Sequence, residues 1–151
     1  DNQQVNTDSV QIEYHRLLRS YLSIQNTSSY ESLKSRGLEL IKNDSLRLKI
    51  ISLYEEDYKG MIKMEEEYAE HQFYTNFFKD INTLVSPNFI FNTNGDLVSI
   101  ELPLALSKEE KNKFLTYLIK IRTARNLAVT LYDTLDLKIK KLITSIDAEI
   151  K

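Results

Sequence analysis

The segment TSSYESLKSRGLELIKNDSLRLKIISLYE, residues 27–55, carries the signals that end one helix and begin another. Ser28 and Glu31 have the spacing of a capping box, in which a hydroxyl accepts from a first-turn N–H and the glutamate reaches back to the cap. Gly37 follows two basic residues, and we expect it to close the helix in a left-handed backbone conformation. These signals predict a short helix over residues 29–36.

An apolar connector and a second helix start follow Gly37. The connector, Leu38 to Ile41, is too apolar to be solvated, so we expect it to form a buried elbow. Asn43 or Asp44 then caps the next helix. Its apolar residues recur at helical spacing: Leu46, Ile50, Leu53 and Tyr54. The whole segment therefore predicts a corner between two helices, and it indicates architecture rather than chemistry.

The same segment resembles a bacterial family of uncharacterised membrane-anchored proteins, the domain of unknown function 6090 type. The resemblance rests on a structural signature: Ser28, Tyr30, Glu31, Leu33, Gly37, Leu40, Ile41, Asn43, Asp44, Leu46 and Arg47. It is strong over residues 27–55, fainter over 111–151 and not visible between 86 and 106. Members of the family resemble one another in a short basic N-terminus, one transmembrane helix and a helical region after it. The resemblance implies no catalytic residues.

The transmembrane helix of that family is missing from this chain. No window approaches the ~20 consecutive apolar residues that span a bilayer, and position 1 is Asp1 rather than methionine. The resemblance implies a parent protein tethered to the membrane just upstream of Asp1. A basic tail before the membrane helix stays in the cytoplasm. This region is then expected in the periplasm, at the inner membrane of a Gram-negative bacterium.

Composition narrows the class of protein. A length of 151 residues fits one domain, residues 1–151, with a core of its own. The 20 basic residues do not outnumber the 22 acidic ones, which argues against a nucleic-acid partner. Without cysteine the chain has no disulfide, thiolate metal site or thiol nucleophile. Only three glycines and two prolines occur, which predicts long uninterrupted helices.

The periodic pattern predicts an elongated all-α bundle. After residues 1–7, expected to be disordered, an amphipathic helix is predicted over about 8–25, with Val10, Tyr14, Tyr21 and Ile24 on its apolar side. A third helix is predicted over about 44–85. It and a last helix over about 108–150 are nearly equal in length, so we expect an antiparallel two-helix hairpin against which the N-terminal helices lie.

The last helix has the most regular pattern in the chain. Ser107 and Glu110 repeat the capping-box spacing. Ten residues then alternate steps of four and three, which we call the seam: Phe114, Leu118, Ile121, Arg125, Ala128, Tyr132, Leu135, Ile139, Leu142 and Ile146. This heptad spacing predicts packing against a partner helix, from the same chain or another. The charged member, Arg125, is expected to extend outward or meet an acidic side chain.

Residues 86–106 are predicted to be a connector or a hairpin that caps the bundle. Asn94-Gly95 favours a type I′ turn between two strands within 88–102. That turn would pair Phe91 with Val98 and Phe89 with Ile100, on one face. An irregular capping loop is the alternative. The aromatic residues just before this segment either pack beneath it or line a groove for a partner: Tyr68, Phe73, Tyr74, Phe77 and Phe78.

The candidate metal ligands are Glu67 and His71, which share a face if one helix carries both. Di-iron bundles, however, need two Glu-x-x-His motifs. Tyr68 lies three residues before His71, and Ile12 three before His15, so the motif fails twice. A solvated acidic face is the favoured interpretation, and no cofactor is predicted.

The sequence leaves two classes of function. The favoured one is a non-enzymatic, membrane-tethered helical module that binds a protein partner or associates with itself through helix faces. Its basis is the seam, the lack of catalytic motifs and the family resemblance. The alternative is a small-molecule or metal-binding sensor or enzyme, with its site between helices near Glu67 and His71.

Overall fold

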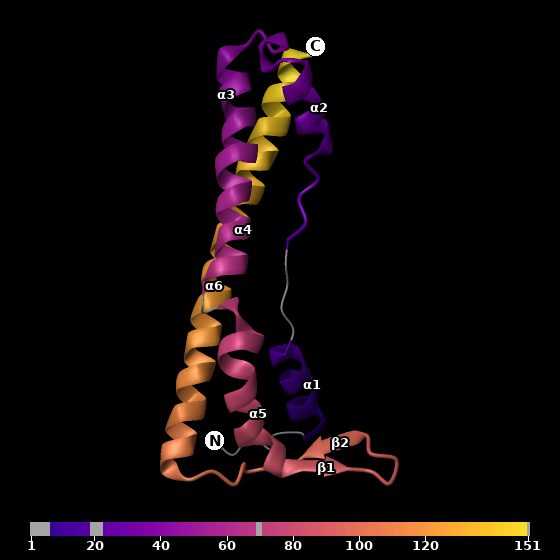
Figure 1. Cartoon of the computed structure of the whole chain (residues 1–151), viewed down its shortest axis with the longest axis vertical. Helices are drawn as coiled ribbons and strands as arrows, with labels where there is room; N and C mark the ends of the chain where they lie inside the picture. Colours follow the sequence, from indigo (N-terminus) through magenta and orange to yellow (C-terminus); the bar gives the residue numbers. More distant parts are fainter. Residues whose placement is uncertain (1–6, 19–22, 69–70, 151) are drawn as a thin grey trace. The chain divides into compact units, whose positions relative to one another are not determined.

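The structure is a computed structural model that describes residues 7–18, 23–68 and 71–150. Its helices are α1 (Thr7–Leu17), α2 (Ser28–Arg36), α3 (Asp44–Ser52), α4 (Tyr58–Glu67), α5 (Lys79–Val85) and α6 (Lys108–Glu149). Strands β1 (Phe89–Phe91) and β2 (Leu97–Ile100) form an antiparallel two-stranded sheet (Figure 1). The predicted all-α class, with a long C-terminal helix and a small β-hairpin, is confirmed.

The chain divides into two compact units. Unit 1 comprises Asp1–Tyr21 and Ala69–Thr123, and unit 2 comprises Leu22–Tyr68 and Ala124–Lys151. Helix α6 belongs to unit 1 with its first part and to unit 2 with its second part. Each unit has a separate cluster of buried apolar side chains. The expectation of a single domain stays a prediction.

In unit 1, aromatic and branched side chains of α1, residues 73–77, α5, the hairpin and α6 form the core. Its buried members are Tyr14, Phe73, Phe77, Ile81, Val85, Ile100 and Ile121. The Tyr14 hydroxyl donates to Asn82 Oδ1 at 2.7 Å, so the polar end of this core tyrosine has a partner. Phe73 and Phe77 thus pack with Ile100 of the 86–106 segment, as predicted, whereas Tyr68 and Tyr74 are about half exposed, at 49% and 57%.

The hairpin has the predicted strands but a different turn. Phe89 pairs with Ile100, as expected, but Phe91 pairs with Leu97 rather than Val98, because the register shifts after Ile90. The type I′ turn is wrong, since it needs two positive φ angles and only Gly95 has one, at 85°. Asn92 instead closes a longer loop: its side-chain oxygen accepts the N–H groups of residues 94 and 96, both at 2.9 Å. Phe91 and Val98 are consequently exposed.

In unit 2, α3 and α4 run antiparallel to the second part of α6. Asn43 donates to Glu149 at 2.8 Å, Lys138 pairs with Asp57, and Tyr132 donates to Glu65. Along this series of contacts the residue numbers increase in the α3–α4 segment and decrease in α6. The buried core of the unit consists of Tyr30, Leu46, Ile50, Leu53 and Leu142.

The corner between α2 and α3 agrees with the sequence at two of its three helix signals. The Leu46 N–H donates to Asn43 Oδ1 at 3.1 Å, which confirms the cap, and Gly37 ends α2 at φ 102°. The Ser28 capping box is wrong: α2 starts at Ser28, whose N–H and hydroxyl both donate to Asn26 Oδ1 instead.

The apolar elbow after Gly37 is buried only in part. A 3₁₀ turn, Leu38–Leu40, directs Leu38 and Ile41 toward the core of unit 2. Leu40 is 59% exposed, so the expectation of a fully buried connector is wrong at that residue. The turn has only three residues and changes the direction of the chain, so its successive side chains point to different sides and cannot all contact the core.

Helix α6 follows its predicted pattern closely. The Glu110 N–H donates to Ser107 Oγ at 3.2 Å and the Ser107 N–H donates to Glu110 Oε2 at 2.8 Å, so this capping box is formed. Every seam position is buried or half-buried except Arg125, which is exposed, as expected for a guanidinium; its neighbour Ala124 is buried instead. In unit 2, the seam packs against α3 of the same chain.

The predicted helix over 44–85 is not continuous. A π-helical turn, Leu53–Asp57, joins α3 to α4, and α4 ends because Tyr68 has an extended backbone with ψ 120°. A second π-helical turn, Tyr74–Phe78, leads into α5. No proline or glycine marks the break after Glu67, so the sequence pattern runs through it without interruption.

The N-terminal helix is shorter than predicted. Helix α1 ends at Leu17, and Ile24 lies outside a helix with 97% of its surface exposed. Tyr21, and all but the last of the seven residues expected to be disordered, lie outside the described residues; Thr7 itself begins α1. Among the described residues, none of the helices combines the length and the apolar character needed to cross a membrane.

Candidate functional site

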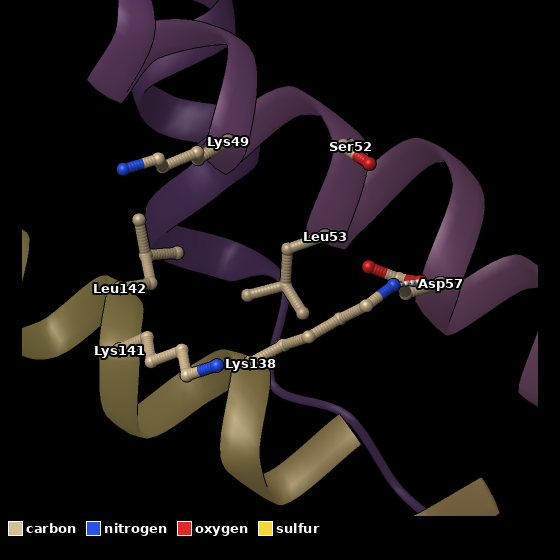
Figure 2. Close-up of a pocket in the computed structure, with 7 residues that line it drawn as sticks. All are labelled: Lys49, Ser52, Leu53, Asp57, Lys138, Lys141 and Leu142. Carbon is tan, nitrogen blue, oxygen red and sulfur yellow. Dashed lines mark hydrogen bonds and ion pairs between the residues drawn. The ribbon is translucent and has the colours of Figure 1, made fainter. Parts of the chain in front are cut away.

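A hollow of about 300 Å³ lies in unit 2 between α6 and the segment formed by α3 and the π-helical turn after it (Figure 2). Its lining residues are Lys49, Ser52, Leu53, Asp57, Lys138, Lys141 and Leu142. We call it the lysine-lined hollow. The side chains of Leu53 and Leu142 point into the space between the helices, and both are buried. The hollow therefore combines an apolar floor with a charged rim.

Helical spacing explains why these residues meet. On one side, Lys49 and Leu53 are four residues apart, as are Leu53 and Asp57, so all three share a face. The last two are the ends of the π-helical turn. On the other side, α6 presents Lys138, Lys141 and Leu142 within one turn and a quarter. π-helical turns are rare overall, and those that occur are often found at functional sites.

The charges at the rim are unequal. Three lysines and a single aspartate line the hollow, and Asp57 is already paired with Lys138 (Figure 2). The ammonium groups of Lys49 and Lys141 have no ion pair within the described part of the chain. They stand on the same side of the Lys138–Asp57 pair, one on each helix. The rim thus offers two unneutralised positive charges above an apolar floor.

Beside this hollow, Glu55 fastens α2 to the α3 side. Its carboxylate accepts from Tyr30 at 2.9 Å, from Lys34 at 2.6 Å and from Lys59. The hydrogen bond from Lys34, followed by those from Lys59 and Tyr30, lowers the pKa of Glu55 to about 2. The Tyr30 ring also stacks on Tyr54 with centroids 4.3 Å apart. This carboxylate is saturated with donors, so its role is structural.

A second carboxylate of unit 2 is buried. Glu65 has only 6% of its surface exposed, accepts the Ser23 N–H at 2.9 Å and also accepts the Tyr132 hydroxyl. Burial, reinforced by the hydrogen bond to Glu65, raises the pKa of Tyr132 to about 12. A neutral hydroxyl held against a carboxylate joins α4 to α6.

Unit 1 contains an equivalent link between α5 and α6. Asp80 accepts from the Tyr117 hydroxyl and pairs with Lys113 at 3.1 Å. The hydrogen bond from Tyr117, and then that from Lys113, lowers the pKa of Asp80. Like Glu55, this carboxylate is held ionised by donors around it, and such an arrangement does not suit a general base.

The candidate metal ligands, Glu67 and His71, do not share a helix. Helix α4 ends at Glu67, and the extended backbone of Tyr68 separates it from His71. The side chain of Glu67 lies 3.9 Å from the ammonium of Lys63. Across residues 7–18, 23–68 and 71–150, histidines, aspartates and glutamates do not gather in groups of three or more that could hold a metal ion.

The signature residues of the 27–55 segment contribute to folding. Tyr30 and Leu46 are in the core of unit 2, while Asp44 pairs with Arg47 at 2.6 Å in the first turn of α3. The hollow itself was missed in the sequence. Leu53 and Leu142 were recognisable as core positions, but no motif marks the lysines, because lysine on an exposed helical face is ordinary.

Comparisons with known proteins give no relative: no protein-family model, curated protein or solved structure matches this chain. The family resemblance of residues 27–55 therefore stays a prediction.

Proposed function

We propose that this chain is a non-enzymatic helical module that associates with a second copy of itself through α6. One observation carries the proposal. In unit 2, α6 buries its seam against α3 and still exposes five large aliphatic side chains by 36% or more: Leu127, Val129, Leu131, Leu137 and Ile143. Single exposed aliphatic residues are ordinary on a protein surface, so the spacing of these residues decides whether they form a second packing surface.

Two of these aliphatics belong to a regular row. Val129, Asp133, Asp136, Lys140 and Ile143 follow one another at steps of four, three, four and three, and all are exposed. We call them the outer row. The spacing is that of the seam, so the outer row runs parallel to it on a different side of the helix. A second heptad row is what a helix needs to pack on two neighbours.

The outer row is complementary to itself when two copies lie antiparallel. Val129 then faces Ile143 of the second copy, and Asp133 faces Lys140 of the second copy. Each contact occurs twice, as a two-fold interface requires. Asp136 falls near the axis, where its ion pair with Lys140 of its own helix, at 2.5 Å, offsets the repulsion between the two carboxylates. Asp133 has no ion pair within the described residues and is available for this contact.

The test combines mass in solution with cross-linking. The chain has no cysteine, so single cysteines report cleanly. Mixing Val129→Cys with Ile143→Cys should give a disulfide-linked heterodimer, whereas Thr134→Cys, on another side of α6, should not cross-link. A Val129→Cys homodimer would indicate parallel copies. Light scattering that shows a monomer at 0.1 mM, together with no cross-link, would refute the proposal.

Charge reversal distinguishes association through the outer row from nonspecific hydrophobic association. Asp133→Lys places like charges opposite each other and should weaken association by about tenfold. Adding Lys140→Asp together with Asp136→Asn to the same chain restores opposite charges at this contact without leaving an unpaired carboxylate at the axis, and should recover most of the loss. If both variants associate equally poorly or equally well, the antiparallel arrangement is wrong.

We also propose, on the resemblance of residues 27–55 alone, that the parent protein is anchored in the inner membrane of a Gram-negative bacterium with this region in the periplasm. The genomic sequence immediately upstream of Asp1 tests this. An apolar segment of about 20 residues preceded by basic residues supports it. An upstream segment without such a span contradicts it.

A further inference from the structure

We propose that the lysine-lined hollow binds a small organic anion, with a carboxylate as its head and a short aliphatic chain as its body. This site is separate from the outer row: Lys138, Lys141 and Leu142 lie on a different side of α6 from Val129, Asp133 and Ile143. The inference therefore stands or falls independently of self-association.

The size of the hollow sets the first limit on the ligand. Its volume of about 300 Å³ is at the lower end of the range for small-molecule pockets. Leu53 and Leu142 form its apolar floor, with 6% and 8% of their surfaces exposed. Because this floor is already buried, the gain comes mainly from the ligand's own aliphatic chain, whose apolar surface the hollow removes from water.

The charge at the rim sets the second limit. Lys49, Lys138 and Lys141 line the hollow and Asp57 is its one acidic lining residue, which leaves two positive charges in excess. The two unpaired ammonium groups stand one on each helix, on the same side of the Lys138–Asp57 pair (Figure 2). An anion held in the hollow would supply the acidic partner that these two ammonium groups lack. A cationic or neutral ligand of the same shape would not.

The type of cation sets the third limit. Lysine is a compact point charge on a flexible stem, without the planar fork by which arginine reads carboxylate geometry. Two lysines on separate helices can converge on one anionic head at variable distance. We therefore expect selection by charge and by chain length rather than by the detailed shape of the head.

Octanoate is the probe for the experiment, with octanamide as its neutral partner and inorganic phosphate as an anion without an apolar body. In calorimetry and in ¹H–¹⁵N spectra, octanoate should saturate and shift the amides of Leu53 and Leu142. Octanamide should bind about tenfold more weakly, since it lacks the charge. Phosphate alone should not saturate below 10 mM. Octanoate affinity should fall as salt is raised.

Two variants locate the site. Lys49→Gln and Lys141→Gln should each weaken octanoate about tenfold while leaving octanamide unchanged. Lys63→Gln is the matched control, because Lys63 is an exposed lysine of the same unit that does not line the hollow. All three exchange a surface lysine, so thermal melts should stay close to that of the parent chain.

Three outcomes overturn the proposal. Equal binding of octanoate and octanamide would mean that the charge of the head group does not contribute to affinity and that only the aliphatic chain is recognised. Octanoate binding that is unaffected by Lys49→Gln and Lys141→Gln, or affected equally by Lys63→Gln, would place the anion elsewhere. Absence of saturable octanoate binding would mean that the two positive charges serve no ligand of this class.

Discussion

The hydroxyl of Tyr132 should stabilise unit 2 because it donates to a carboxylate that has little access to water. Glu65 is the acceptor, and it also receives the Ser23 N–H. Replacement of Tyr132 by phenylalanine keeps the ring and removes only the donor. We predict that Tyr132→Phe lowers the free energy of unfolding, whereas Tyr74→Phe, whose ring is 57% exposed, does not.

The expected magnitude follows from the charge and burial of the acceptor. Hydrogen bonds to charged groups contribute ~1.5–3 kcal/mol, more than the ~1 kcal/mol of a neutral pair. Glu65 keeps the Ser23 N–H at 2.9 Å in the variant, so its desolvation is still partly compensated. We therefore expect a loss of about 1.5–2 kcal/mol for Tyr132→Phe, against less than about 0.5 kcal/mol for the exposed control.

The effect should depend on pH in one direction. Burial, and then the hydrogen bond to Glu65, raises the pKa of Tyr132 from 10.0 to about 12 in the folded chain. A raised pKa means that the stabilisation is fully present below pH 10, the unfolded value, and is lost as the pH rises through about 12. The difference in stability between the parent chain and Tyr132→Phe should therefore shrink over this interval.

Urea unfolding followed by circular dichroism measures the free energy of unfolding of both chains at pH 7, and at pH 11 it measures how much their difference has shrunk. Absorbance at 295 nm, which reports phenolate, measures the pKa of Tyr132 as a difference titration between the parent chain and Tyr132→Phe. The reasoning is refuted if Tyr132→Phe is within 0.5 kcal/mol of the parent chain at pH 7. It is also refuted if the missing tyrosine titrates near 10.

Three further predictions use features of the helices. Ser107→Ala removes a formed cap and should cost ~1 kcal/mol in urea unfolding, whereas Ser28→Ala, which removes no cap, should cost less than half of that. Gly60→Ala should stabilise by ~0.5–1 kcal/mol, because a helical Cβ there meets open space. Gly37→Ala should destabilise by ~1–2 kcal/mol, because φ is 102°, so thermal melts should shift in opposite directions for the two variants. The stabilisation by Glu55, measured against Glu55→Gln, should be present above pH 4.5 and be lost as the pH falls through about 2, since its pKa is lowered. A pH-independent difference would contradict that assignment.

The sequence predicts the fold best where one period continues without interruption. The seam of α6 follows steps of four and three over more than thirty residues, so its faces could be assigned residue by residue. The caps at Asn43 and Ser107 were also readable, because each is a local arrangement of two or three residues. Ser28 has the same signature as Ser107, but Asn26 lies just before it and takes its hydrogen bonds.

The break at Tyr68 was not readable. Neither proline nor glycine is near it, and the residues on both sides are good helix formers. The helix ends where the chain passes from one unit to the other: Met64 is buried and belongs to unit 2, whereas Phe73 is in the core of unit 1. Local propensity carries no information about such a change.

The hollow could not have been found from sequence either. Its key charges, Asp57 and Lys138, are 81 residues apart and are each typical of a solvated helical surface. What makes them a site is the meeting of two helices, one of which contains a π-helical turn. The apolar floor was predictable from periodicity, and the rim was not.

The π-helical turn Leu53–Asp57 changes which residues face the core further along the chain. Leu46, Ile50 and Leu53 are buried at steps of four and three, and the same steps would bring Asp57 and then Gly60 inward. Met61 is buried in its place, one position later. A π turn holds one residue more than an α turn. We expect, therefore, that losing one residue here would leave both flanking helices intact, and that related chains should align with a one-residue gap at this point.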